Sequence, residues 1–444
     1  MRGFVLDLNR CTGCHACLLA CSVENELGEQ KSWRQVFTFN MRRRTGISRH
    51  HLSLGCLHCA DPACMRVCPA SAYARDPATG AVLIDTRLCI GCKYCSWACP
   101  FDAPRYSRDT GTMAKCTCCN DRLLQGRNPA CASLCPTGAL QFAELEAEAG
   151  VGSVPGFPAT ALGPAMRFMP LRSADTGPEL RAAPDEPAVA TDYQDLDSAP
   201  APKVTIESEW SLVFFSLAAA LLVAIASAAV AGSMRIDAFD FLIAALGAIG
   251  VSALHLGKLR RSWRAILNLR HSWLSREITF YSAFTVLAAI MFFLPAVAPV
   301  LSWPAVLSGF MGLFCIDRVY ESVSGDKWSR LHSARVLLTG LLLFGILTVN
   351  PMIAGLTGLL KLVLYAYRQS WFKSNPRALA SVLRLGAGFV VPLAIWRVYP
   401  DWVLPSVLVG EVVDRCEYYL DLDIVTPRRQ IASDLDKSRD LHPF

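Results

Sequence analysis

Hydrophobic and polar positions divide the chain into three regions. Residues 1–142 are polar and rich in cysteine, residues 144–209 are rich in Pro, Ala and acidic side chains, and the remainder is mostly apolar. The apolar region contains eight segments near the ~20 residues that a helix needs to cross hydrocarbon, although several are shorter. They lie at 211–231, 239–257, 278–298, 302–319, 334–350, 352–368, 381–398 and 402–420. The pattern predicts an all-α membrane domain of about eight transmembrane helices.

The joints between these segments carry helix-end signals, mainly Gly, Asn and Pro. The shortest joint is Asn350 and Pro351, between the fifth and sixth segments. One long kinked helix in place of these two segments is an alternative, and it would change the parity of the spans.

The middle region reads as a linker. Acidic residues recur through it, and nine prolines between Pro155 and Pro202 interrupt any long helix. Such a composition cannot bury a core of its own. We expect residues 144–206 to run extended over the first domain or a partner and to deliver the chain to the bilayer.

Sixteen of the nineteen cysteines fall into four groups of four. The first and third groups have the spacing C-x2-C-x2-C-x3-C of bacterial ferredoxin ligands, and the second and fourth stretch it but keep a final C-x3-C-P. The groups are Cys11, Cys14, Cys17 and Cys21; Cys56, Cys59, Cys64 and Cys68; Cys89, Cys92, Cys95 and Cys99; and Cys116, Cys119, Cys131 and Cys135.

The spacing has a chemical reason. Three thiolates two residues apart, on a loop around a cubane, can reach three irons of one cluster, and the fourth cysteine points away to a neighbouring cluster. Sixteen ligands at four per cluster predict four 4Fe-4S clusters in an α+β, ferredoxin-like domain of two ferredoxin-type repeats. Cys118 does not keep the C-x2-C step of Cys116 and Cys119, so we expect it to be a bystander.

Two other uses of cysteine compete with this interpretation. Separated C-x2-C pairs build zinc sites, but zinc ribbons do not need four consecutive quartets, three of which end in Cys-Pro. Disulfide frameworks need an oxidising compartment and usually a signal peptide. Here Arg2, Asp7 and Arg10 stand directly before the ligand Cys11, which leaves no room for a cleaved leader.

Composition adds little beyond this picture. A hydrophobic content of 53% and a mean hydropathy of +0.33 are high for a soluble protein of 444 residues. The formal net charge of +6 averages an acidic linker against basic loops. A basic patch at Arg42, Arg43, Arg44 and Arg49 is interpreted as a solvated face or a docking surface, and we expect no nucleic acid partner.

Together these residues resemble two subunits of the DMSO reductase family of molybdopterin enzymes. The quartets and the stretch from Lys115 to Leu140 resemble its iron-sulfur subunit. The membrane half resembles its anchor subunit through Glu209-Trp210, Leu254-His255-Leu256-Gly257, residues 272–277, Gly410-Glu411 and Asp414-Arg415. Those subunits are usually separate proteins, whereas here they are fused, which fixes a one-to-one stoichiometry.

The resemblance implies a separate molybdopterin catalytic subunit as partner, and it implies how the cysteines share clusters. The first motif pairs with the fourth, and the second with the third, each exchanging its last cysteine. The implied sets are Cys11, Cys14, Cys17 and Cys135; Cys116, Cys119, Cys131 and Cys21; Cys56, Cys59, Cys64 and Cys99; and Cys89, Cys92, Cys95 and Cys68.

Orientation follows from the basic residues of the short loops. If the first span starts inside, the inside loops and tail carry nineteen Lys and Arg residues, against Arg235 and Arg397 outside. This predicts a multi-pass protein of the cytoplasmic (inner) membrane with its clusters on the cytoplasmic side. The alternative is that the basic loops complement an acidic iron-sulfur domain docked against them, whichever compartment holds it.

A quinone, menaquinone or ubiquinone, exchanges protons as well as electrons, so its site needs titratable groups at the membrane edge. His255 is our first candidate because imidazole can hydrogen-bond a quinone oxygen and exchange a proton near neutral pH. A histidine at a helix end can also be a simple cap. Intramembrane Asp317 and Glu411 are further candidates, although mutual structural ion pairs account for them equally well.

The chain is therefore predicted to comprise a four-cluster domain (1–143), a linker (144–206), a membrane anchor with a quinone site (207–422) and a polar tail (423–444). Its predicted role is to carry electrons between the membrane quinone pool and the molybdopterin subunit. There are three alternatives. The same clusters could carry electrons in the opposite direction, from cytoplasmic sulfite oxidation to a quinone. The protein could also be a self-sufficient quinone reductase fed by a soluble donor, or a zinc-bearing adaptor without a redox role.

Overall fold

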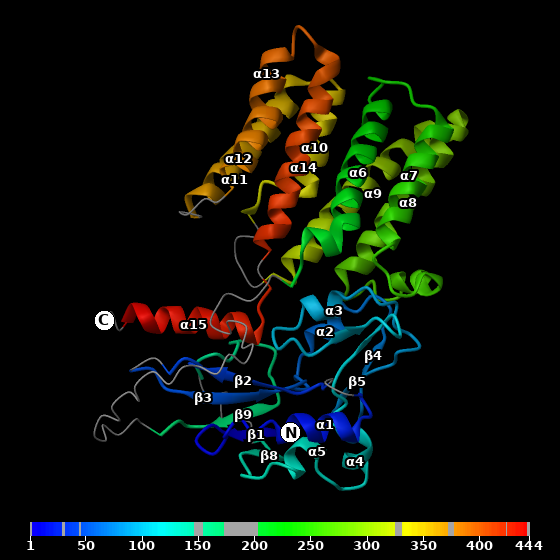
Figure 1. Ribbon diagram of the computed structural model, residues 1–444. Helices are drawn as coiled ribbons and strands as arrows, with labels where there is room; N and C mark the ends of the chain where they lie inside the picture. Colours follow the sequence, from blue (N-terminus) through cyan, green and yellow to red (C-terminus); the bar gives the residue numbers. More distant parts are fainter. Residues whose placement is uncertain are drawn as a thin grey trace.

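The computed structural model describes residues 2–28, 32–43, 46–145, 154–172, 203–324, 331–371, 377–422 and 424–441. A small α+β domain occupies one end of the molecule, and long helices extend away from it (Figure 1). The expected order, an α+β domain followed by an all-α domain, is confirmed.

A three-stranded sheet closes the first domain. Strand β1 (Arg2–Asp7) lies between β8 (Leu140–Glu144), which is antiparallel to it, and β9 (Met166–Met169), which is parallel. Phe4 and Leu6 point into the core from β1. Because β1 pairs with strands more than 130 residues away, the first residues of the chain hold the end of the domain in place.

Besides this sheet, the described part of the first domain contains three two-stranded hairpins, β2–β3, β4–β5 and β6–β7. Five short helices begin within or next to the cysteine loops. The remaining elements are α1 (Ala16–Glu24), β2 (Gln35–Phe39), β3 (His50–Leu54), α2 (Ala63–Val67), β4 (Tyr73–Arg75), β5 (Val82–Ile84), α3 (Tyr94–Trp97), β6 (Arg105–Ser107), β7 (Thr112–Ala114), α4 (Asn120–Leu124) and α5 (Ala130–Ser133).

The structure extends the first domain beyond the predicted limit at residue 143. Residues 154–172, placed in the linker from their composition, contribute β9 and bury Phe157 and Met166 in the domain core. A few apolar side chains spaced among prolines are enough to add one strand to an existing sheet. The rest of the predicted linker, residues 146–153 and 173–202, lies outside the described residues.

Each of the eight predicted spans coincides with a helical segment. The segments are α6 (Ile206–Val230), α7 (Ala238–Ala253), α8 (Trp273–Phe293), α9 (Ala298–Glu321), α10 (Val336–Leu347), α11 (Pro351–Trp371), α12 (Ala378–Leu385) continued by a π-helical turn (Gly386–Val390) and α13 (Val391–Ile395), and α14 (Val403–Asp421).

Length and composition separate these segments into two classes. Among the described residues, four helical stretches are long and apolar enough to cross a membrane: 206–230, 273–293, 295–321 and 378–395. Helices α7 and α10 are apolar but shorter. The eight helical segments are therefore present, while four of them meet the demands of a span by themselves.

The predicted polar tail forms a helix that packs on the first domain. Helix α15 (Pro427–Leu441) lies beside β2 and β3 (Figure 1), with Ile431 and Leu435 in their core. Asp434 accepts a hydrogen bond from the backbone of Gly156 at 2.8 Å. These two apolar residues, one helical turn apart, stand among charged ones, which is why composition alone predicted a tail.

Replacing Ile431 by Ala is expected to lower the free energy of unfolding of the first domain by about 2–5 kcal/mol, because it leaves a cavity in a closed core. Thermal unfolding of the purified protein, followed by amide hydrogen exchange in β2 and β3, measures this. Asp436→Ala, on the exposed face of the same helix, is the control and should change stability by about 0.5 kcal/mol or less. Equal effects of both variants would show that α15 does not stabilise this core.

Candidate iron-sulfur and membrane sites

The cysteine loops turn through left-handed backbone before their short helices. His15 (φ +62°) and Lys93 (φ +60°) stand between cysteines of the first and third quartets and precede α1 and α3. Gly13 and Gly91 also have positive φ, which a glycine adopts without strain. These residues reverse the direction of each loop just before its short helix begins.

In space, the last cysteine of the first quartet lies near the fourth quartet, and the last cysteine of the fourth lies near the first. Burial raises the pKa of the Cys11 thiol, and the nearby Cys17 and Cys135 thiols raise it further. Burial likewise raises the pKa of Cys119, and the nearby Cys21 thiol adds to the rise. We call Cys11, Cys14, Cys17 and Cys135 the first set, and Cys21, Cys116, Cys119 and Cys131 the fourth set.

The last cysteines of the second and third quartets lie near the other quartet in the same way. Burial raises the pKa of Cys64 well above its usual range, and the nearby Cys56 and Cys99 thiols act in the same direction. Burial raises the pKa of Cys92 to about 12, and among the thiols Cys68 contributes most to the rise. We call Cys56, Cys59, Cys64 and Cys99 the second set, and Cys68, Cys89, Cys92 and Cys95 the third set.

Backbone hydrogen bonds reach sulfurs of these sets, and among the described residues no three His, Cys, Asp or Glu side chains converge on one ion position. Backbone N–H groups of Gly91 and Ala72 donate to the sulfurs of Cys89 and Cys68, at 3.4 Å in both cases. Such bonds favour the thiolate that iron requires.

Buried cations accompany the thiols. Arg34 is 2% exposed, lies within electrostatic range of thiols of the first and fourth sets, and has its Nη2 atom without a hydrogen-bond partner among the described residues. Lys115 is 1% exposed and interacts electrostatically with Cys56 and Cys64 of the second set. A buried cation is costly unless it is paired, so these positions fit sites that carry negative charge.

Hydrogen bonds from the membrane domain hold the third set against the helix ends. Ser272 Oγ donates to the Val67 carbonyl at 2.9 Å, and Asn268 Nδ2 to the Cys68 carbonyl at 2.9 Å. The Lys258 N–H donates to the Ile90 carbonyl at 3.1 Å, and Arg261 Nη1 to the Cys89 carbonyl at 3.2 Å. The backbone on both sides of Cys68 and Cys89 is therefore fixed by residues of the membrane domain.

Tyr94, between Cys92 and Cys95, extends this contact into the bundle. Its hydroxyl donates to the Val319 carbonyl of α9 at 2.8 Å. Burial raises the pKa of this hydroxyl, and the nearby carboxylate of Glu277 acts in the same direction. Tyr94 thus connects this loop to α9 by a hydrogen bond and lies within electrostatic range of the Glu277 carboxylate on α8.

His255 follows the end of α7 beside the same loop. Its Nδ1 atom is hydrogen-bonded to the Ser252 carbonyl, which can only accept, so Nδ1 carries the proton and Nε2 is left as an acceptor. The ring is half-buried. Two residues further on, Gly257 packs against Gly111 and Tyr106 with no room for a side chain. The glycine therefore allows the His255 segment to approach the first domain closely.

A lysine and a glutamate lie close to His255 at this edge of the bundle. Lys93, in the third-set loop, lies within electrostatic range of His255, and its Nζ atom is 4.0 Å from Oε1 of Glu209 on α6. Glu209 is 3% exposed, and its Oε2 atom has no hydrogen-bond partner among the described residues. His255, Lys93 and Glu209 thus gather titratable groups at the edge of the bundle, next to the third set.

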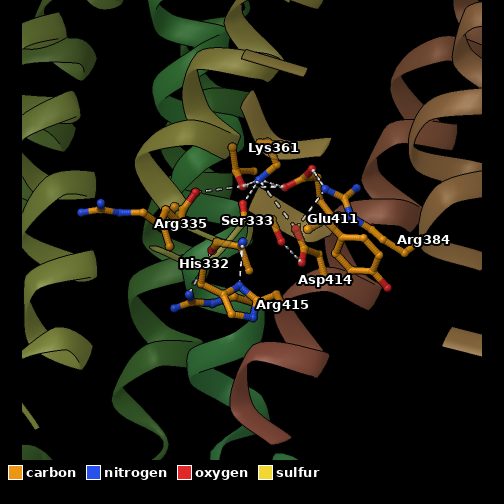
Figure 2. Close-up of polar contacts among 12 residues, drawn as sticks. His332, Ser333, Arg335, Lys361, Arg384, Glu411, Asp414 and Arg415 are labelled. Carbon is orange, nitrogen blue, oxygen red and sulfur yellow. Dashed lines mark hydrogen bonds and ion pairs between the residues drawn. The ribbon is translucent and has the colours of Figure 1, made fainter. Parts of the chain in front are cut away.

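The other two candidates from the sequence have different partners. Asp317 accepts hydrogen bonds from the backbone N–H groups of Val336 (2.7 Å) and Leu337 (3.2 Å) at the start of α10. Glu411 pairs with Lys361 (2.9 Å) and Arg384 (3.0 Å) in a buried cluster that also contains Asp414 (Figure 2). Both carboxylates therefore have partners inside the bundle, whereas the hydrogen bond of His255 is to the helix-end carbonyl of Ser252, as in a cap.

Sequence reasoning missed several of these residues. Lys93 and Tyr94 lie between two ligands, so their position next to Cys92 was the available signal. Lys115 directly precedes Cys116 and offered a similar signal. Arg34 is distant from every quartet in the sequence, and the cysteine spacing gives no sign that it lies near the thiols in space.

Comparison with known proteins agrees with both halves of the structure. Residues 48–145 match the family described as 4Fe-4S dicluster domain, and residues 205–357 match the family described as DMSO reductase anchor subunit (DmsC). The second, third and fourth quartets fall within the first match, and helices α6 to α10 fall within the second. The molecule is therefore an iron-sulfur electron-transfer protein joined to an integral membrane anchor.

Curated relatives match the first domain. A component of the anaerobic dimethyl sulfoxide reductase of Haemophilus influenzae is 39% identical over 153 residues, and the probable anaerobic dimethyl sulfoxide reductase component YnfG of Escherichia coli is 40% identical over 152 residues. Each match covers 32% of this chain and 74% of the relative. A sulfite dehydrogenase subunit of Allochromatium vinosum is 37% identical over 162 residues, which cover 32% of this chain and 68% of the relative.

The matches to the dimethyl sulfoxide reductase components span most of each relative, and the anchor match begins where the first domain has ended. Both parts of the resemblance seen in the sequence are thereby confirmed, and they lie on one polypeptide. This protein belongs to the family of dimethyl sulfoxide reductase iron-sulfur subunits, with a DMSO reductase anchor domain fused to it.

Proposed function

We propose that this protein is the electron-transfer and membrane-anchor subunit of an oxidoreductase complex, and that it carries electrons between the membrane quinone pool and a separate molybdopterin catalytic subunit. One observation carries the proposal: the third set of cysteines is hydrogen-bonded to the ends of the membrane helices beside His255. An electron carrier and a titratable membrane-edge site are thus adjacent. The names of the two dimethyl sulfoxide reductase relatives support a catalytic partner of that type.

We assign one 4Fe-4S cluster to each of the four sets, with the sixteen cysteines as ligands. Each bound cluster would supply one-electron exchange at its position. The proximity of Cys135 to Cys11 and of Cys68 to Cys92 supports the exchange of last cysteines between motifs. Arg34 and Lys115 would offset the negative charge of the ligands and raise the reduction potentials near them.

At the membrane edge, His255 would accept the proton of a quinol hydroxyl at Nε2, because its Nδ1–H is held by Ser252. Lys93 would stabilise the oxygen anion that forms as the proton leaves, since its ammonium lies within range of the ring. Glu209, with one carboxylate oxygen unpartnered among the described residues, would take a second proton. In the opposite direction the same residues would return protons to a quinone.

For sidedness, we propose the cytoplasmic (inner) membrane with the first domain on the cytoplasmic side. Three of the basic residues counted in the loops, Arg368, Arg384 and Arg415, are buried within the bundle. Removing them from the count still leaves a large excess of Lys and Arg at the end of the bundle next to the first domain.

A second direction of flow has specific support. The sulfite dehydrogenase subunit of Allochromatium vinosum matches the first domain at 37% identity. With the first domain in the cytoplasm, the protein would then take electrons from sulfite and reduce a quinone. A self-sufficient quinone reductase fed by a soluble donor remains the alternative that lacks a molybdenum partner.

Anaerobic purification from the native membrane, without stripping partners, tests the proposal as a whole. We expect about sixteen irons per polypeptide, as four cubanes require, together with stoichiometric molybdenum. Iron without molybdenum would favour the self-sufficient quinone reductase. Zinc in place of iron would contradict the electron-transfer role.

Replacing His255 by Leu is expected to slow reduction of the clusters by added quinol by about 100-fold or more, because the proton acceptor is lost. Stopped-flow spectroscopy of the anaerobic complex measures the rate, and dithionite titration checks that the same number of clusters is present. His271→Leu, at an exposed position just before the start of α8, is the control. An unchanged quinol rate in the His255 variant would rule out His255 as the proton acceptor.

Replacing Lys115 by Met is expected to lower the reduction potential of the cluster in the second set. Removing a buried positive charge disfavours the added electron, by on the order of 59 mV if the one-electron equilibrium changes tenfold. Redox titration followed by electron paramagnetic resonance measures the shift. Arg87→Met removes the same charge from an exposed side chain paired with Asp85, and it should shift no potential. Equal shifts in both variants would refute a local effect of Lys115.

A further inference from the structure

The second half of the membrane domain contains a large apolar cavity away from the first domain. Its volume is about 920 Å³, and it lies between α10 and α11 on one side and the π-helical turn, α13 and the start of α14 on the other. In Figure 1, α13 stands at the end of the bundle opposite the first domain. Most of the lining residues, including the stretch 388–407, lie beyond the segment that matches the anchor family.

The cavity arises from small residues on one face of α11. Ala354, Gly355 and Gly358 face it, and a side chain at Gly355 would meet nothing within 4 Å. On the other side, Gly388 of the π-helical turn packs directly on Gly410 of α14, which pulls this segment away from α11. The helices are thus held by contacts elsewhere, and their own side chains leave the space between them unfilled.

Such a space needs an apolar occupant. Protein interiors are close-packed, and a large apolar gap forfeits the dispersion contacts of its walls. The cavity opens on the outer surface of the bundle, since Leu359, Leu393 and Val398 in its wall are 59%, 79% and 65% exposed. In a membrane this surface faces hydrocarbon, so the occupant comes from the bilayer.

The rim indicates what kind of head group the occupant carries. Arg397 is the one charged residue among those that line the cavity in the described part of the chain. It is exposed and pairs with no described carboxylate. Trp396 lies beside it, and tryptophan is typical of the membrane interface. A basic side chain and an indole at the mouth of an apolar cavity match a phosphate head group above an acyl tail.

A quinone fits the cavity less well. Its carbonyl oxygens need donors at the head group, and the deep walls are aliphatic, with Leu342, Ile346 and Val407 among them. The nearest buried donor, Arg384, lies behind Gly388 and pairs with Glu411 (3.0 Å) and Asp414 (2.9 Å) (Figure 2). Arg384 and Lys361 balance the charge of these two carboxylates, and neither cation lines the cavity, although Nε and Nη1 of Arg384 have no hydrogen-bond partner among the described residues.

We propose that this cavity is a specific binding site for one anionic phospholipid, with the phosphate on Arg397 and an acyl tail between α11 and α13. The lipid would complete the packing of the second half of the bundle. The site is separate from the quinone site proposed at His255 and does not depend on it.

The test measures the phospholipid that the intact complex retains after purification into a neutral detergent, with phosphatidylglycerol as the added probe and native mass spectrometry as the readout. We expect Arg397→Gln to lower retention by about fivefold, the effect of roughly 1 kcal/mol per basic residue. Gly358→Leu places a side chain in the cavity, and a Cβ at this position meets only Leu342, at 3.8 Å, so this variant should lower retention at least as much.

Two control variants match these changes. Arg235→Gln removes the same charge from the loop after α6, and Gly250→Leu adds the same side chain to α7, where nothing lies within 4 Å. Both should retain lipid as the unaltered protein does. Normal quinol-dependent reduction of the clusters in Gly358→Leu would show that this variant is folded.

Three outcomes would overturn the proposal. Retention of phosphatidylglycerol could be unchanged in both Arg397→Gln and Gly358→Leu. The control variants could lose lipid to the same extent, which would mean that binding is annular. The molecule displaced by Gly358→Leu could be a quinone or a neutral lipid, in which case the cavity serves another ligand.

Discussion

Hydrogen bonds from the ends of the membrane helices to backbone carbonyls of the cysteine loops connect the two halves of this protein. Ser272, Asn268 and Arg261 donate to carbonyls at Val67, Cys68 and Cys89, and the Lys258 backbone donates to Ile90. Bonding to carbonyls leaves the charge on the sulfurs unchanged, so the loops can be fastened while their thiolates stay free for iron. Everything proposed for electron transfer depends on this contact, because it sets the third set of cysteines next to His255.

Buried positive charges have different partners in the two domains. In the first domain, the buried cations Arg34 and Lys115 lie among thiols, and they are compensated only if the cysteines carry negative charge. In the membrane domain, the buried cations Arg384 and Lys361 are paired with the carboxylates of Glu411 and Asp414. The first arrangement fits a bound anionic group, whereas in the second the two positive and two negative charges balance one another. Removing one partner of a buried ion pair costs much free energy of folding, so such a cluster holds its helices together strongly.

Fusion of the iron-sulfur and anchor parts has a structural counterpart beyond the linker. Helix α15 follows the last membrane helix and returns to the first domain, where Ile431 and Leu435 enter its core. The polypeptide therefore holds the first domain from both ends of the membrane domain. A separate anchor protein would have to form the same interface against the entropy of association, and the fusion removes that cost.

The sequence by itself determined the chemistry of the first domain and the helical nature of the second. Cysteine spacing is a local property, because three ligands on one short loop reach one cluster wherever that loop lies, and the periodic apolar segments from residue 211 become helices for an equally local reason. Other features depend on contacts between residues far apart in the sequence. They are the proximity of Cys135 to Cys11, the burial of Arg34, and the packing of β9 and α15 on the first domain. Composition predicted a linker at residues 154–172 and a tail at α15, since a few apolar side chains gain value only against a surface that already exists. Such contacts are decided by tertiary structure, because their free energy comes from the partner surface and not from the segment that carries the residues.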